Sequence, residues 1–267
     1  YPLRRQRQMC IRDRAWHQLG KILIKSGKFK EALSAFDFAI ISDDTFTGAY
    51  IEKGNLLESI GKTNEAIQNY EVAMNTTDPT SFIHKCIGRC HENLGNIYLA
   101  KKFYLKSIQL EPSNENSWES LILFFINQKK YKKAEYYLSR ALEINSDSTN
   151  LWKKSLELNA LNGKQERVRI SSNRLVELGN SKSDIFIHLI DFFIEKKVWV
   201  NAYEFAEEAV SSFPKNRNLA LRLAGCYLNL SRTEEGLNLL NSSSLNTSEK
   251  TSFIKLFPNY GKLISDM

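Results

Sequence analysis

Apolar side chains, both small and large, return along this chain in a fixed register of 34 residues. In the first repeat the register is marked by Trp16, Leu19, Gly20, Ala32 and Phe36. Later repeats carry similar residues at Tyr50, Gly54, Ala66, Tyr70, Ala73, His84, Gly88, Ala100, Tyr104, Trp118, Ala134, Trp152, Phe186, Ala202, Ala224 and Tyr227. Seven such repeats cover residues 13–250 without an insertion. Because self-similarity at a period of about 20–50 residues is typical of repeat proteins, the pattern predicts an array of stacked units.

Each repeat is expected to form two antiparallel helices in close contact. Its eighth and twentieth positions hold small residues, which let two helices approach each other. They are Gly20, Gly54, Gly88 and Ala224 at the eighth position, and Ala32, Ala66, Ala100, Ala134, Ala202 and Gly236 at the twentieth. Large aromatic residues at the fourth and twenty-fourth positions fill the space around that contact. Gly27, Gly61, Gly95 and Gly163 fall between the two helices, where a helix end favours a left-handed residue.

This register resembles that of the tetratricopeptide repeat family, whose pattern is W-x2-L-G-x2-Y, then A-x3-F, then A and P. The phrases Cys86–Gly95 and Leu223–Tyr227 and the tail Leu256–Pro258 are also similar to uncharacterised repeat proteins of Bacteroidota. The family resemblance implies an all-α fold: a right-handed superhelical solenoid of about seven antiparallel helix pairs. The repeats are expected near residues 13–46, 47–80, 81–114, 115–148, 149–182, 183–216 and 217–250. One pair is too small to hold a core alone, so stability must come from stacking.

Departures from the pattern gather in the middle of the chain. Ile122, Leu156 and Ile190 replace the small eighth residue, and Val168 and Leu175 replace both alanines of the fifth repeat. Because these side chains are larger, we expect wider helix spacing or altered curvature near residues 149–190.

The C-terminal end is expected to close the array. Residues 241–252 are rich in serine, asparagine and threonine, which is typical of a loop. The apolar run from Phe253 to Phe257 then predicts a short capping helix within residues 251–267, because a terminal repeat must cover an open hydrophobic end.

The basic charge of the chain is concentrated at its start. The net charge is +7, from 37 basic and 30 acidic residues, but five arginines lie within residues 1–14. Residues 4–13 resemble the translation of a transposon-end sequencing adapter, so we interpret residues 1–14 as non-native and the chain as a fragment. The remainder has 32 basic and 29 acidic residues, a net charge of +3. The alternative interpretation is an arginine-rich arm that binds nucleic acid.

Composition and motifs exclude several classes of protein. The longest apolar stretch, Leu121–Ile126, is too short to span a bilayer. Four cysteines do not make a disulfide scaffold, which favours a cytoplasmic location. Cys86 and Cys90 lie near two histidines, but Cys90 occupies a core position of the repeat, so no metal site and no cofactor are expected. No nucleophile elbow, zinc-protease or dinucleotide motif occurs, and the chain is expected not to be an enzyme.

The resemblance implies that certain positions of each first helix line an inner groove. Here they are polar and of mixed charge. The candidate peptide-binding residues are Lys21, Lys25, Asn55, Lys85, Arg89, Asn93, Asn127, Lys154, His188, Asp191 and Arg222. Asparagine and arginine can bond a peptide backbone or a carboxylate. The alternative is that they are merely exposed residues of helices, with ion pairs worth about 0–1 kcal/mol each.

The leading hypothesis is a non-enzymatic scaffold that holds a peptide or helix of a partner protein in this groove, with neither nucleic acid nor membrane as a partner. The runner-up is that the array is the substrate-recruiting arm of a larger enzyme, such as a glycosyltransferase or sulfotransferase. RNA binding is disfavoured by the mixed charge. The carboxylate clamp with which some members of the family bind chaperone tails is also disfavoured, because the required positions hold residues such as Glu52, Phe82 and Glu157.

Overall fold

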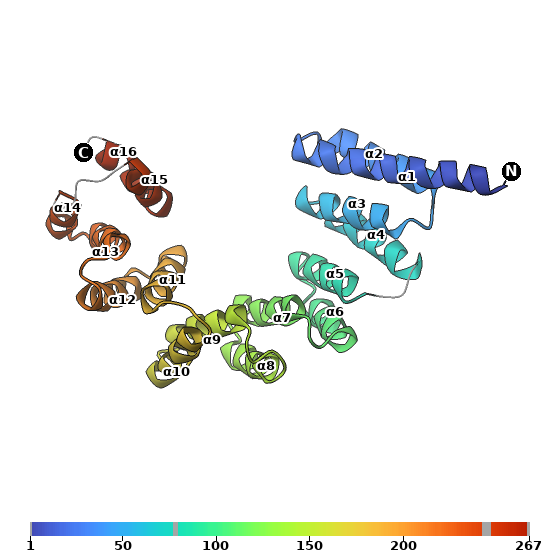
Figure 1. Ribbon diagram of the computed structural model, residues 1–267. Coiled ribbons are helices and arrows are strands. Elements are labelled where there is room, and N and C mark those ends of the chain that lie inside the picture. Colours follow the sequence, from blue (N-terminus) through green and yellow to red (C-terminus); the bar gives the residue numbers. More distant parts are fainter. Residues whose placement is uncertain (1, 77–79, 242–246, 266–267) are drawn as a thin grey trace. The chain divides into compact units, whose positions relative to one another are not determined.

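The structure is a computed structural model that describes residues 2–76, 80–241 and 247–265, and over these residues it is helical, without strands. It divides into two compact halves, residues 1–146 and 147–267. The helices of the N-terminal half are α1 (Pro2–Lys25), α2 (Phe29–Ser42), α3 (Thr47–Ser59), α4 (Thr63–Thr76), α5 (Ser81–Asn93), α6 (Ile97–Leu110), α7 (Glu115–Asn127) and α8 (Tyr131–Ile144). Each odd-numbered helix packs on the even-numbered helix that follows it, so this half is a row of helix pairs (Figure 1).

The C-terminal half continues the same alternation. Its helices are α9 (Thr149–Leu161), α10 (Gln165–Glu177), α11 (Lys182–Glu195), α12 (Trp199–Ser212), α13 (Arg217–Asn229), α14 (Thr233–Asn241), α15 (Thr247–Leu256) and α16 (Gly261–Ser265), with a 3-10 turn at Pro258–Tyr260. In both halves no described helix is long and apolar enough to cross a membrane.

The close helix contact predicted at the eighth position is present in the first three repeats. A Cβ atom added to Gly20 would lie 2.5 Å from the ring of Phe36, and one added to Gly54 would lie 2.7 Å from the ring of Tyr70. Gly88 stands in the same relation to Tyr104, at 2.9 Å. The small residue and the aromatic residue sixteen positions later therefore form one packing unit, and glycine is required because the ring occupies the place of a side chain.

The turn between the two helices of a repeat uses a left-handed residue at the fifteenth position. Gly27, Gly61, Gly95 and Gly163 have φ angles of +73°, +81°, +75° and +65°, as their placement in the sequence predicted. The same position is left-handed in the other three repeats, where it holds the non-glycine residues Lys129, Lys197 and Ser231. The fold thus imposes this conformation even where a side chain makes it unfavourable.

The first helix of most repeats begins with a side-chain cap. Thr80, Ser148 and Ser181 each accept a hydrogen bond from the backbone N–H three residues later, at the starts of α5, α9 and α11. Asn114 and Asn216 do the same two residues later for α7 and α13. These caps satisfy backbone donors that the helix itself leaves free, and so they fix where each first helix starts.

The core of the C-terminal half extends into its last helices. Phe253 and Phe257 are 1% and 2% exposed within the same apolar cluster as α11 and α13, and the Tyr260 hydroxyl donates to the backbone oxygen of Leu228 at 2.9 Å. Helix α15 begins at Thr247, so the prediction of a loop over residues 241–252 is wrong for 247–252, where Thr251 bonds back to Thr247. Residues 242–246, which that prediction also covered, lie outside the described part of the chain.

Candidate peptide-binding surface

The eleven candidate residues all lie on first helices of the repeats. Within each half, these helices are neighbours: α1 contacts α3, α5 contacts α7, and α11 contacts both α9 and α13. The N-terminal half holds Lys21 and Lys25 on α1, Asn55 on α3, Lys85, Arg89 and Asn93 on α5 and Asn127 on α7. The C-terminal half holds Lys154 on α9, His188 and Asp191 on α11 and Arg222 on α13.

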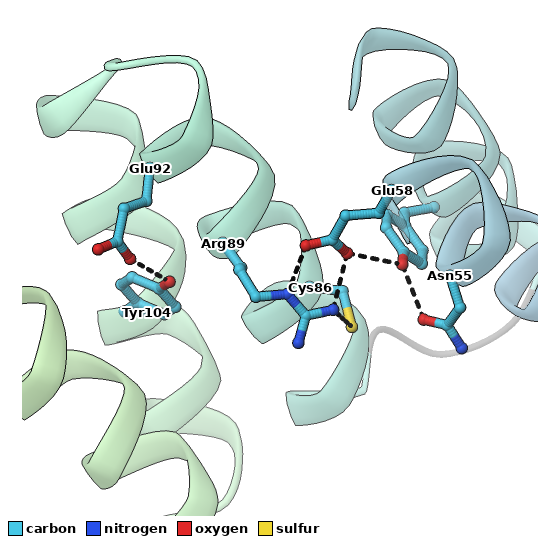
Figure 2. A network of polar contacts seen from close by, with 7 residues as sticks. Asn55, Glu58, Cys86, Arg89, Glu92 and Tyr104 are labelled. Carbon is cyan, nitrogen blue, oxygen red and sulfur yellow. Dashed lines mark hydrogen bonds and ion pairs between the residues drawn. The ribbon is translucent and has the colours of Figure 1, made fainter. Parts of the chain in front are cut away.

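Arg89 is the centre of a polar network between α3 and α5 (Figure 2). Its Nη2 donates to Oε2 of Glu58 at 2.7 Å, and its Nε donates to the other oxygen of the same carboxylate. The hydroxyl of Tyr70 donates to Oδ1 of Asn55 at 2.8 Å and to Glu58 at 3.3 Å. The hydrogen bonds to Glu58 raise the pKa of Arg89 above its ordinary value, so the guanidinium stays charged. The candidate residue Asn55 is therefore held in place by the buried Tyr70, and the candidate residue Arg89 by the nearly buried Glu58.

A second glutamate connects the next pair of first helices in this half. Glu92 on α5 accepts from the Tyr104 hydroxyl at 2.8 Å, as Figure 2 shows, and from Nδ2 of Asn127 on α7 at 3.2 Å. Burial, followed by the hydrogen bond to Glu92, raises the pKa of Tyr104, so its hydroxyl remains a donor at neutral pH. Asn127 is thus positioned by the preceding repeat.

Glu157 plays the corresponding part in the C-terminal half. Its side chain is 7% exposed and accepts from Nζ of Lys154 at 3.0 Å, and it lies 2.9 Å from Nε2 of His188. Burial alone raises the pKa of this carboxyl, but the hydrogen bond with His188 and the charge of Lys154 outweigh it, and the net pKa is lowered. Arg222 on α13 clamps Asp191 on α11 through two bonds of 2.7 and 2.8 Å.

These contacts follow one rule of spacing. Three of them join the ninth position of one repeat to the sixth position of the next, which is a separation of 31 residues: Lys21 with Glu52 at 3.9 Å, Glu157 with His188, and Asp191 with Arg222. Glu58 and Arg89 are separated by the same 31 residues. Repeat position predicts that the candidate residues among them share one face, but their pairing was not predicted. Opposite charges 31 residues apart, three fewer than the repeat length, would have indicated it.

The remaining candidates are not engaged by carboxylates. Among the described residues, Lys25, Lys85 and Asn93 form no side-chain hydrogen bond or ion pair, and the Nζ atom of Lys85 lies 5.3 Å from the ring centre of Phe82. Lys85, Arg89 and Asn93 are four residues apart on α5 and so follow one another along one face of the helix. This stripe presents hydrogen-bond donors whose positions are partly fixed by the fold.

The cysteines of α5 belong to the core. Cys86 and Cys90 are fully buried, and burial raises the pKa of the Cys90 thiol to about 12, which disfavours its reactive thiolate form at neutral pH. Cys90 packs at the tenth position of its repeat, as predicted. The rings of His84 and His91 both lie against Phe103, at 5.9 and 5.5 Å. No group of three potential metal ligands is present within the described ranges.

Comparison with known families agrees with this geometry. A family profile of the tetratricopeptide repeat matches residues 13–40 and 87–114. The chain contains tetratricopeptide repeats. A second profile, that of the ChAPs (Chs5p-Arf1p-binding proteins), matches residues 151–262. Tetratricopeptide repeats are an adaptor fold that serves protein interaction, and this broad role is the one that the family supports.

Solved structures confirm the predicted all-α repeat fold. A tetratricopeptide repeat protein from Parabacteroides merdae is 16% identical, with a TM-score of 0.58 over 92% of this chain and 98% of its own. A structure of pilF from Pseudomonas aeruginosa is 15% identical, with a TM-score of 0.55 over 79% of this chain and 96% of its own. The Cut9-Hcn1 hetero-tetramer of the APC/C also matches 79% of this chain, with a TM-score of 0.51, 18% identity and 42% of the other chain covered. At these identities, the likeness concerns the fold alone.

One curated relative is an Hsp70-Hsp90 organising protein from Plasmodium falciparum. It is 26% identical over 106 residues, which are 39% of this chain and 41% of the relative. The match therefore spans about two fifths of the relative's length.

Proposed function

We propose that this chain is a non-enzymatic scaffold that binds a peptide segment or helix of a partner protein along the first helices of its repeats. The observation that carries the proposal is the donor stripe of α5, made of Lys85, Arg89 and Asn93, in which Arg89 is held by Glu58. A partner that binds Arg89 loses less side-chain entropy on binding, because Glu58 already restricts the conformation of this side chain. Guanidinium and amide groups are suited to carboxylates and to peptide backbone.

Two further features support a binding role, and a third bears on the compartment. The family is an adaptor family, and its relatives include a protein whose name describes the organisation of two other proteins. The candidate donors recur on successive first helices, which favours an extended or helical guest over a small molecule. The buried free thiols of Cys86, Cys90 and Cys226 suit a reducing compartment, and we propose a cytoplasmic location.

The experiment that tests the proposal must separate binding from folding, because reversing Arg89 alone would leave Glu58 without its partner. We therefore exchange the pair, with Glu58→Arg and Arg89→Glu in one variant, and combine this exchange with Lys85→Glu. Short peptides are first selected against the unaltered chain from a displayed random library, and their affinities are then measured for each variant. We expect peptides that bind at least about tenfold more weakly to the altered chain.

The matched control exchanges another pair of charges on a second helix. Arg140 and Glu143 on α8 lie 3.6 Å apart, and Arg140→Glu with Glu143→Arg is combined with Lys132→Glu on the same helix, so that the net charge changes as it does in the α5 variant. This control should leave the affinities unchanged. The proposal is wrong if no selected peptide distinguishes the α5 variant from the control.

A further inference from the structure

A cavity of about 730 Å³ lies in the C-terminal half, between α10 on one side and α11 and α12 on the other. One wall is apolar and is formed by Ile185, Phe186 and Leu189 of α11 together with Phe205 and Phe213 of the next helix and its end. None of the eleven candidate residues of the first helices lines it. The cavity is therefore a feature separate from the donor stripe of α5.

The opposite wall is mostly polar because α10 departs from the repeat pattern, although Val168 and Val176 also line it. At the seventeenth, twenty-first and twenty-fourth positions, the first repeat has Phe29, Leu33 and Phe36, and its Phe36 is fully buried. The fifth repeat has Gln165, Arg169 and Ser172 at the same positions, and all three line the cavity. In this repeat the eighth position holds the fully buried Leu156, where the first repeat has Gly20, so Leu156 takes up the place of the ring. The short side chain of Ser172 then borders the cavity without filling it. The cavity lies within residues 149–213, which overlap the region near 149–190 where the sequence predicts wider helix spacing or altered curvature.

We propose that this cavity binds an uncharged, apolar segment of a partner polypeptide. Its volume lies within the roughly 300–1,000 Å³ typical of cavities that enclose ligands. The apolar wall would take aliphatic or aromatic side chains of the segment. Gln165, Ser172 and Asn173 on the other wall carry groups that both donate and accept hydrogen bonds, as the backbone of a peptide requires.

The charges around the cavity select against a charged guest. Glu166 and Arg169 bind each other through two hydrogen bonds of 2.6 and 3.1 Å, so neither presents an unopposed charge. The other two charged residues of the lining, Lys182 and Glu208, have opposite signs. The lining is therefore electrically neutral, and an uncharged segment loses the least hydration on entry.

The test uses the full chain and the displayed library of random short peptides. Ser172→Phe places a ring at a residue that lines the cavity, on a side where the buried Leu156 leaves no room for it toward the first helix of the repeat. Ser172→Ala is its matched control because it leaves the volume open. We expect a class of selected peptides, uncharged and rich in aromatic or aliphatic residues, that binds Ser172→Ala normally and Ser172→Phe at least about tenfold more weakly. The same class should be indifferent to the exchange of Glu58 and Arg89, which distinguishes this site from the proposed function.

A second variant guards against misfolding. Phe186→Ser acts on the opposite wall and should weaken the same peptides, and the thermal unfolding of all variants is followed by circular dichroism. If Ser172→Phe does not fold, Phe186→Ser decides alone. The binding of monolaurin, an uncharged amphiphile that is not a peptide, is measured with the same variants. The inference is overturned if no selected peptide is sensitive to the cavity variants, or if the sensitive peptides carry net charge. It is also overturned if the cavity variants weaken the binding of monolaurin alone.

Discussion

The guanidinium of Arg89 in α5 donates two hydrogen bonds to the carboxylate of Glu58 in α3, and so connects two consecutive repeats. The Glu58 side chain is only 10% exposed, whereas that of Arg89 is 47% exposed. The pair therefore has two roles that can be measured separately. The ion pair neutralises the nearly buried carboxylate of Glu58, and it leaves part of the Arg89 guanidinium exposed to solvent.

The Arg89→Ala variant is expected to lower the free energy of unfolding by about 1–2 kcal/mol, because it leaves the Glu58 carboxylate without its charged donor. Exchanging the two residues should recover most of this loss, since the pair is restored in reverse. Urea unfolding of the single and double variants measures both effects. A single variant as stable as the unaltered chain would mean that the carboxylate is hydrated and that the contact contributes nothing.

Lys197 is left-handed, with a φ of +57°, at the position where four other repeats have glycine. A side chain in this conformation costs about 1–2 kcal/mol, and glycine avoids that cost but gains freedom in the unfolded chain. We therefore expect Lys197→Gly to stabilise the C-terminal half by about 0.5–1 kcal/mol. The neighbouring Lys196 has a φ of −79°, so Lys196→Gly should instead destabilise it by a similar amount. Thermal unfolding of the two variants should shift in opposite directions.

His91 on α5 gives the N-terminal half a dependence on pH. Burial lowers its pKa below 6.5, an effect that the charge of Glu71 only partly offsets, and its Nδ1 atom is buried without a hydrogen-bond partner. Because the unfolded chain takes up a proton at higher pH than the folded chain, stability should fall as the pH drops below about 6.5.

His91→Phe should remove this contribution, since other repeats have Phe125 and Phe193 at the same position. We expect the variant to be more stable by about 1 kcal/mol near neutral pH, and the advantage to grow as the medium becomes acidic. Urea midpoints measured across this range test the sign. An advantage that shrinks on acidification would show that the protonated form of His91 stabilises the folded chain. His17, whose pKa burial also lowers, is common to both proteins and cancels in the comparison.

The features that the sequence predicts best are those that the same helix–helix contact requires in every repeat. Gly20 faces Phe36 because every well-formed repeat has to bring two helices together at that point, so the periodicity alone indicates the contact. The left-handed Lys129 was not predicted, because composition identifies such a turn only when glycine occupies it. The start of α15 at Thr247 was missed because serine and threonine are as common in helix caps as in loops.

The candidate surface was only partly predictable for a related reason. Repeat position places Asp191 and Arg222 on the same kind of face, but whether they offer charges to a partner or neutralise each other depends on contacts between helices. The cavity beside α10 was also missed. Periodicity identifies positions that depart from the pattern, such as Ser172, but does not show whether a neighbour fills the space they leave.

Gly54 and Tyr70 allow the packing rule of the repeat to be tested directly. A Cβ atom at residue 54 would lie 2.7 Å from the Tyr70 ring, so Gly54→Ala should destabilise the N-terminal half by about 1–3 kcal/mol. The fourth repeat accommodates Ile122 at the eighth position together with Leu138 at the twenty-fourth, both buried. Adding Tyr70→Leu to Gly54→Ala should therefore cost less than the sum of the two single changes. A double-mutant cycle in urea measures this coupling, and strictly additive effects would mean that the ring moves aside without a cost in free energy.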